Sequence, residues 1–137
     1  MGKNILVTII GILGSAITSI FGGWSAAMTT LVIFMAIDYL TGLITAGVFH
    51  KSTKTDSGTL ESRAGFKGLC RKGAMLLIVL VACRLDLTLS TTYIKDAVII
   101  AFIANETISI IENAGLMGVP IPDTIKNAVD VLQRNKK

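Results

Sequence analysis

Hydrophobic residues in this 137-residue chain fall into four long runs, and polar residues gather mainly between and after them. The runs lie near residues 5–21, 26–48, 73–89 and 97–117. A helix needs about 20 mainly apolar residues to cross the ~30 Å hydrocarbon layer of a membrane. We therefore predict an all-α integral membrane protein with about four transmembrane helices, in a domain that covers residues 1–119.

The first run follows Lys3 and also has the features of a cleaved secretory signal, because the small residues Ser25, Ala26 and Ala27 come after it. A second apolar run starts at once, so we favour a helix that is retained. The residues between the two runs, from Gly22 to Ser25, predict a tight turn.

Asp38 interrupts the second run near its middle and shares a helical face with Thr41 and Gly42. A charged side chain at the centre of a bilayer costs about 2.5–3.5 kcal/mol on insertion scales. We therefore expect Asp38 to have a partner. A hydrogen bond to another helix of the same subunit and a position on the wall of a pore are both open.

The fourth run carries a stripe of polar residues. Glu106, Ser109 and Glu112 are spaced by three, while Asn105, Ser109 and Asn113 are spaced by four, so all five lie on one side of a helix. Polar groups at membrane depth are rare and usually face a partner or a water-filled space. The stripe predicts the polar wall of an assembly that perforates a membrane.

The third run is apolar only as far as Cys83, and Arg84 and Asp86 follow it. About 11 residues of helix rise only about 16 Å, so whether this run fully spans is left open. Arg84 could reach the membrane surface by snorkelling. Alternatively, it is the charged helix partner of Asp38 or Glu106.

Residues 50–72 form the main hydrophilic segment and predict a basic cytoplasmic loop that faces anionic lipid. Its basic residues are Lys51, Lys54, Arg63, Lys67, Arg71 and Lys72. If all four runs span, both termini lie on the same side as this loop, and the opposite side has only Arg84 and Lys95. Because cytoplasmic loops carry the excess of Lys and Arg, we predict that both termini are cytoplasmic.

Residues 120–137 are predicted as a cytoplasmic tail with a short amphipathic helix. Pro120 and Pro122 prevent the fourth helix from continuing. In the tail, apolar residues recur at helical spacing, at Ile125, Ala128, Val129 and Leu132. This helix could lie on the membrane surface or pack on a neighbouring subunit's loop.

The composition agrees with a membrane protein, with 52% hydrophobic and 16% charged residues. The net charge of +4 could suggest a nucleic-acid partner. The position of the basic residues instead favours lipid, so we expect no nucleic acid. Cys70 and Cys83 are expected to be reduced. With one His and no metal-ligand, nucleophile or nucleotide-binding motif, we expect no catalytic residues, metal or cofactor, and no enzyme.

Three blocks of sequence carry a family resemblance: DYLTGLITAG at 38–47, GFKGLCRK at 65–72 and NETISIIENAGLMGVPIP at 105–122. They resemble the toxin-secretion and phage-lysis holins of Gram-positive bacteria and their phages. The resemblance implies a multi-pass homo-oligomer of the bacterial (host) cytoplasmic membrane that opens lesions for timed lysis or export. The partner it implies is an endolysin, which is a cell-wall hydrolase, or a secreted toxin. An antiholin could be a further partner.

Other functions are weighed against this one. In a small ion-channel or transporter subunit, Asp38 and Glu106 would be permeation or proton-relay groups. In a membrane scaffold, the basic loop and tail would recruit partners. Leakage of a folded protein, as opposed to ions alone, would distinguish a holin from a channel.

Overall fold

A computed structural model describes residues 1–136, and Lys137, the last residue of the predicted tail, lies outside the described residues. The described chain forms five helices, which confirms the all-α prediction. They are α1 (Gly2–Ile20), α2 (Ala26–Gly47), α3 (Ser62–Leu89), α4 (Ile94–Leu116) and α5 (Asp123–Lys136).

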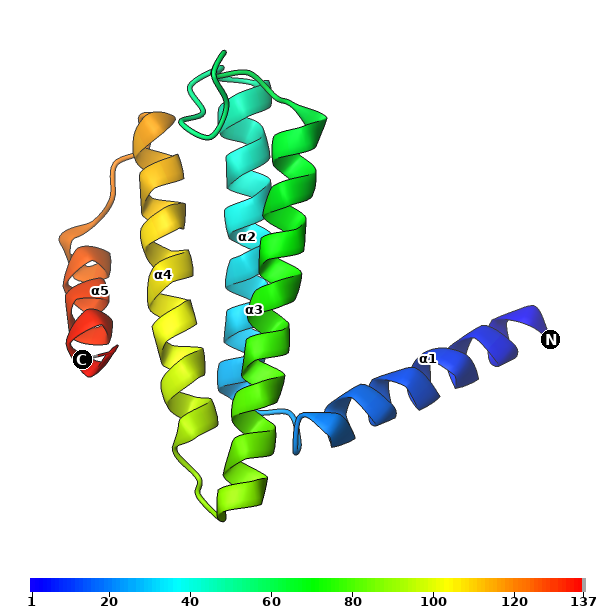
Figure 1. The fold of residues 1–137 in the computed structure, drawn as a ribbon. Coiled ribbons are helices and arrows are strands. Elements are labelled where there is room, and N and C mark those ends of the chain that lie inside the picture. The colour runs from blue at the N-terminus through cyan, green and yellow to red at the C-terminus, as the bar shows by residue number, and fades with distance from the viewer. Residues whose placement is uncertain (137) are drawn as a thin grey trace.

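Helices α2, α3 and α4 lie side by side as an antiparallel bundle (Figure 1). The most extensive packing is between α2 and α4, and α3 also packs against α4. Helix α5 lies against the outer side of α4, whereas α1 projects away from the bundle. No residue of α1 is buried.

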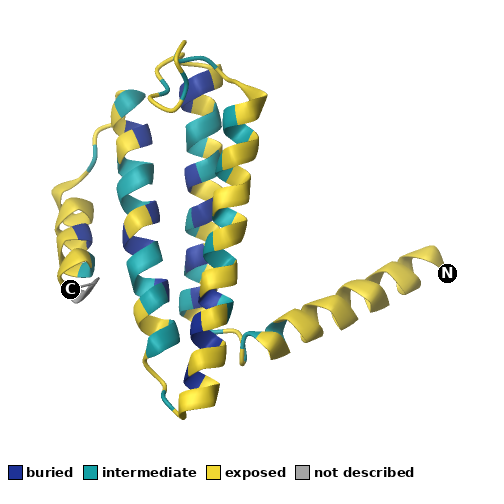
Figure 2. Ribbon diagram, viewed as in Figure 1, coloured by how far each residue is buried: buried dark blue, intermediate teal, exposed yellow. Residues whose placement is uncertain are grey.

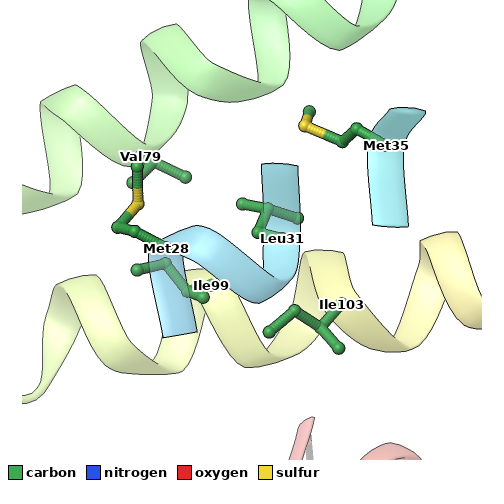
Figure 3. Packing of buried hydrophobic residues seen from close by; sticks show 6 residues of the cluster. All are labelled: Met28, Leu31, Met35, Val79, Ile99 and Ile103. Carbon is green, nitrogen blue, oxygen red and sulfur yellow. The ribbon is translucent and has the colours of Figure 1, made fainter. Parts of the chain in front are cut away.

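The buried positions of the bundle recur at alternating spacings of three and four, as expected for helices packed nearly in line. Their apolar members form one cluster between the three helices (Figure 3), consisting of Met28, Leu31, Met35, Val79, Ile99 and Ile103. The same spacing continues along α2 to Asp38 and along α4 to Glu106. The polar residues therefore lie on the faces that form the core.

The predicted turn between the first two helices is present. Gly22 and Gly23 have φ values of +70° and +102°, in the left-handed region that glycine adopts without strain. The Ser25 hydroxyl then accepts a hydrogen bond of 3.2 Å from the backbone N–H of Met28 and caps α2.

The predicted loop at 50–72 is wrong in its second half, because α3 begins at Ser62. Gly65 and Gly68 do not break the helix. They provide room for Tyr39 of α2, whose hydroxyl donates a hydrogen bond of 3.3 Å to the Gly65 carbonyl. With 28 residues, α3 rises about 42 Å, so it is longer than the ~30 Å hydrocarbon layer.

The tail helix also differs from its predicted positions, because α5 packs on α4 of its own subunit. Val129 is buried in this contact, and Leu132 packs against the core cluster. Both residues belong to the predicted apolar face of the tail helix. The opposite face, which includes Asp123, Lys126 and Asp130, is exposed.

Figure 2 shows that buried positions face the inside of the bundle and exposed positions face outward. Beside its apolar core, the bundle buries several polar residues, and many large apolar residues are exposed on its outside. Its buried polar residues are Asp38, Thr45, Asp86, Glu106 and Asn113. Its exposed apolar residues include Ile33, Ile37, Leu40, Leu77, Ile78 and Val81. Of the described helices, α1 and α2 are long and apolar enough to cross a membrane, judged by length and composition.

Candidate functional site

The centre of the bundle holds a three-residue ionic cluster. The Lys72 ammonium of α3 lies 2.7 Å from Asp38 Oδ2 of α2 and 2.7 Å from Glu106 Oε2 of α4. Both carboxylate side chains are 6% exposed, and the Lys72 side chain is 14% exposed. One cation therefore links three helices at one level of the bundle.

Asn113 of α4 provides further hydrogen bonds to Asp38. Its amide donates hydrogen bonds to the Asp38 backbone oxygen at 3.2 Å, to Asp38 Oδ1 at 3.1 Å and to the Thr41 hydroxyl at 2.9 Å. These contacts lie within one subunit, so Asp38 has the partner that its position in an apolar run requires.

The cluster contains two carboxyl groups and only one ammonium group. With both carboxylates ionised it carries one excess negative charge, and a single proton would neutralise it. Buried ion pairs are stable only when the remaining lone pairs and protons are also satisfied. Among the described residues, every buried side-chain nitrogen or oxygen atom has a hydrogen-bond partner.

The structure brings together only part of the predicted polar stripe. Glu106 and Asn113 are buried, and Ser109 is half-buried. Asn105 and Glu112 are exposed. The stripe is wider than the contact face of α4, which explains why its two outer members remain at the surface.

Pairing of Arg84 with Asp38 or Glu106 was the alternative to snorkelling, and the structure gives that position to Lys72. Arg84 is exposed on α3, and the ion pairs of the described chain involve Lys72 alone. Lys72 was assigned instead to the lipid-facing loop. The other five residues of that set are exposed: Lys51, Lys54, Arg63, Lys67 and Arg71.

The sequence contained a pattern that indicates a position for Lys72 in the core of the bundle. Along α3, successive spacings of three and four residues connect Gly65, Gly68, Lys72, Met75 and Val79, and none of the five is exposed. This spacing places Lys72 in phase with the core of the bundle. The local sequence, which is basic and contains two glycines, instead favoured a loop.

Asp86 is a second buried carboxylate to which the sequence assigned no role. It lies near the end of α3 and accepts hydrogen bonds from the backbone N–H groups of Ile94 at 3.0 Å and Lys95 at 2.8 Å. The Thr91 hydroxyl also donates to it. Since the first N–H groups of a helix have no partner within the helix, Asp86 caps the start of α4.

Lys95 fixes the turn that joins α1 to the bundle. Its ammonium donates to the backbone oxygens of Phe21 at 2.9 Å and Gly23 at 3.4 Å.

Within residues 1–136, no group of three or more His, Cys, Asp or Glu side chains could hold a metal ion.

The part of this chain that matches known proteins includes the whole bundle of α2, α3 and α4. The bacteriophage holin family matches residues 15–134. An uncharacterized 14.9 kDa protein of Clostridium perfringens is 40% identical over 126 residues, which cover 90% of this chain and 89% of that protein. An uncharacterized protein of Halalkalibacterium halodurans is 34% identical over 128 residues, with 89% of each chain covered.

A relative from a phage carries a functional name. The protein named "Probable holin" of Bacillus phage phi105 is 32% identical over 104 residues, which cover 75% of this chain and 71% of that protein. No solved structure matches the chain. The family match contains α2, α3 and α4 in full, together with Asp38, Lys72 and Glu106. The chain belongs to the bacteriophage holin family.

Proposed function

We propose that this chain acts as a holin: it accumulates in the bacterial cytoplasmic membrane, associates with copies of itself and opens lesions. An endolysin made in the cytoplasm would pass through these lesions to the cell wall, and in an export role a toxin would take its place. The observation that carries this proposal is the bundle's distribution of side chains: Asp38, Lys72 and Glu106 pair in its interior, while large apolar side chains are exposed on its outside. Such an exterior suits lipid better than water.

Four spans are the arrangement that fits this bundle. Helices α1 and α2 have the required length and apolar composition. Helix α3 rises about 42 Å, and α4, with 23 residues, rises about 34 Å. Lys72 of α3 and Glu106 of α4 are turned toward α2, and the Lys72 ammonium partly neutralises the carboxylates of Asp38 and Glu106. This arrangement lowers the cost of placing both helices in lipid.

The excess of basic residues gives the orientation. With four spans, the N-terminus, the loop between α2 and α3 and the C-terminal tail share one side, and that side carries most of the Lys and Arg residues. Both termini are then cytoplasmic.

The ionic cluster suggests how a closed subunit would become part of a lesion. In the closed subunit, Lys72 and Asn113 satisfy Asp38, and Lys72 is shared with Glu106. When many subunits associate, rotation of α4 would turn Glu106 toward water shared between them. Hydration of a carboxylate relieves the free-energy cost of its burial, so this rotation would favour an open assembly.

Co-expression in a bacterium tests the proposal. The chain is induced alone, a cytoplasmic cell-wall hydrolase without an export signal is induced alone, and the two are induced together. We expect abrupt lysis only in the third culture. Lysis by the hydrolase alone, or continued growth of the third culture with the chain present in the membrane, would contradict a holin function.

A further inference from the structure

A cavity of about 670 Å³ opens beside the ionic cluster. It is bounded by α2, α3, α4 and the loop between α2 and α3, and Asp38, Lys72 and Glu106 lie among its lining residues. Cavities that bind small molecules commonly have volumes of about 300–1,000 Å³. The size of this cavity is therefore suitable for a lipid head group.

Besides Lys72, four cations line the cavity, namely Lys54, Arg63, Lys67 and Arg71. Glu61 is the one carboxylate among the lining residues outside the ionic cluster. None of the four cations forms an ion pair within the part of the chain that the structure describes. Outside the ionic cluster, the lining of the cavity therefore has an excess of positive charge.

The ammonium group of Lys54 lies close to α2. A Cβ atom placed on Gly42 of α2 would lie 4.0 Å from Lys54 Nζ. The Lys54 side chain thus folds from the loop back over α2, beside the cavity. The excess negative charge of the cavity lies at Asp38 and Glu106, so an anion would bind beside the cations Lys54, Arg63, Lys67 and Arg71.

The rest of the lining includes large apolar side chains. Leu43 of α2, Leu60 of the loop, and Phe102 of α4 contribute to the lining. A free inorganic anion would make no favourable contact with these apolar side chains, whereas a phospholipid presents a phosphate group and hydrocarbon together. Basic pockets between transmembrane helices on the cytoplasmic side bind the head groups of anionic lipids.

We propose that this cavity binds the phosphate-bearing head group of an anionic phospholipid, with Lys54, Arg63, Lys67 and Arg71 around the phosphate. The proposal uses the membrane setting of the proposed function, because that setting places the loop at the lipid head groups. Its test is a binding measurement that requires no lysis, so either proposal can fail while the other stands.

The experiment measures binding of phosphatidylglycerol to the purified full-length chain in a zwitterionic detergent, by native mass spectrometry. The test variant is R63Q/R71Q, which removes two cations from the cavity. The matched control is K51Q/K126Q, which removes two exposed cations that do not line it. Circular dichroism checks that both variants keep the helical content of the wild type.

We expect R63Q/R71Q to bind phosphatidylglycerol at least about tenfold more weakly, because each basic residue near an anionic lipid contributes to its attraction. K51Q/K126Q should stay within about twofold of the wild type. Equal losses in both variants would show diffuse attraction by net charge and would overturn the proposal.

Two further arms identify the source of the phosphate. Phosphatidylcholine should bind much more weakly than phosphatidylglycerol, and equal binding of the two lipids would overturn the proposal. Millimolar inorganic phosphate should leave bound phosphatidylglycerol in place. Displacement by inorganic phosphate would assign the cavity to a soluble anion and overturn the lipid assignment.

Discussion

The ammonium of Lys72 and the carboxylate of Asp38 lie 2.7 Å apart, although 34 residues separate them in the chain. The same ammonium contacts Glu106 of a third helix. In water such a pair would contribute little to stability. Inside an apolar bundle, it determines whether two carboxyl groups can be buried at all.

Replacing Lys72 with Met should destabilise the bundle strongly. Both carboxylates would remain buried without their cation, and loss of one partner of a buried ion pair typically costs about 3–5 kcal/mol. Thermal unfolding in detergent, followed by circular dichroism, measures the effect. The matched control is R84M, which removes an exposed cation from the same helix and should change the stability little. Equal stability of K72M and R84M would contradict the assigned role of Lys72.

Replacing Glu106 with Gln should leave the fold intact but change the timing of lysis. The variant keeps the Lys72–Asp38 pair and removes the excess negative charge whose hydration would favour the open assembly. Lysis onset is measured at equal membrane levels of the protein, together with a co-expressed hydrolase. The control is E112Q on the exposed face of α4. If lysis by E106Q begins at the same time as in the wild type, Glu106 has no part in opening.

Replacing Asp86 with Ala should destabilise the junction between α3 and α4. The change removes hydrogen bonds from the N–H groups of Ile94 and Lys95 to a charged acceptor, and such bonds contribute about 1.5–3 kcal/mol each. Unfolding midpoints should fall for D86A but hardly for D96A, which removes an exposed carboxylate from the first turn of α4. A D86A variant as stable as D96A would show that the cap is dispensable.

Helix α5 should leave α4 when the bundle enters a bilayer. Burial of Val129 and Leu132 contributes about 1.5–3 kcal/mol for each side chain. The exposed face of α5 bears several charges, each costing about 2.5–3.5 kcal/mol if it reaches the bilayer centre. Their combined cost therefore exceeds the gain from the apolar contact.

Spin labels can follow this movement. They would be attached at E112C on α4 and K126C on α5, both exposed positions, with Cys70 and Cys83 replaced by Ala. The distance between the labels should be longer and more widely distributed in liposomes than in detergent. A short, narrow distance in both would mean that α5 stays docked.

The helices of this protein were predictable because their apolar runs are long and three of the four connections between them carry glycine or proline. The need for a partner to Asp38 was also predictable, since an isolated carboxylate in an apolar run is costly. The identity of that partner, Lys72, was not predictable. Lys72 stands in a basic segment with two glycines, and local sequence favoured a loop there, whereas packing against Tyr39 makes it helical.

The contacts of α4 depended on tertiary structure in the same way. Helical spacing correctly placed Glu106 and Asn113 on one side of α4, but it could not show that Glu112 would lie beyond the contact with α2. Asp86 was hidden for another reason. Its partners are backbone N–H groups of the following helix, which no side-chain pattern reveals.

The release of a folded protein from liposomes tests the central claim most directly. Purified chain is reconstituted into liposomes that contain both a small dye and a folded fluorescent protein, and the release of each is followed as the protein-to-lipid ratio rises. The account predicts that above a threshold ratio both are released together. Release of the dye alone at every ratio would instead indicate a narrow channel and contradict the proposed holin function.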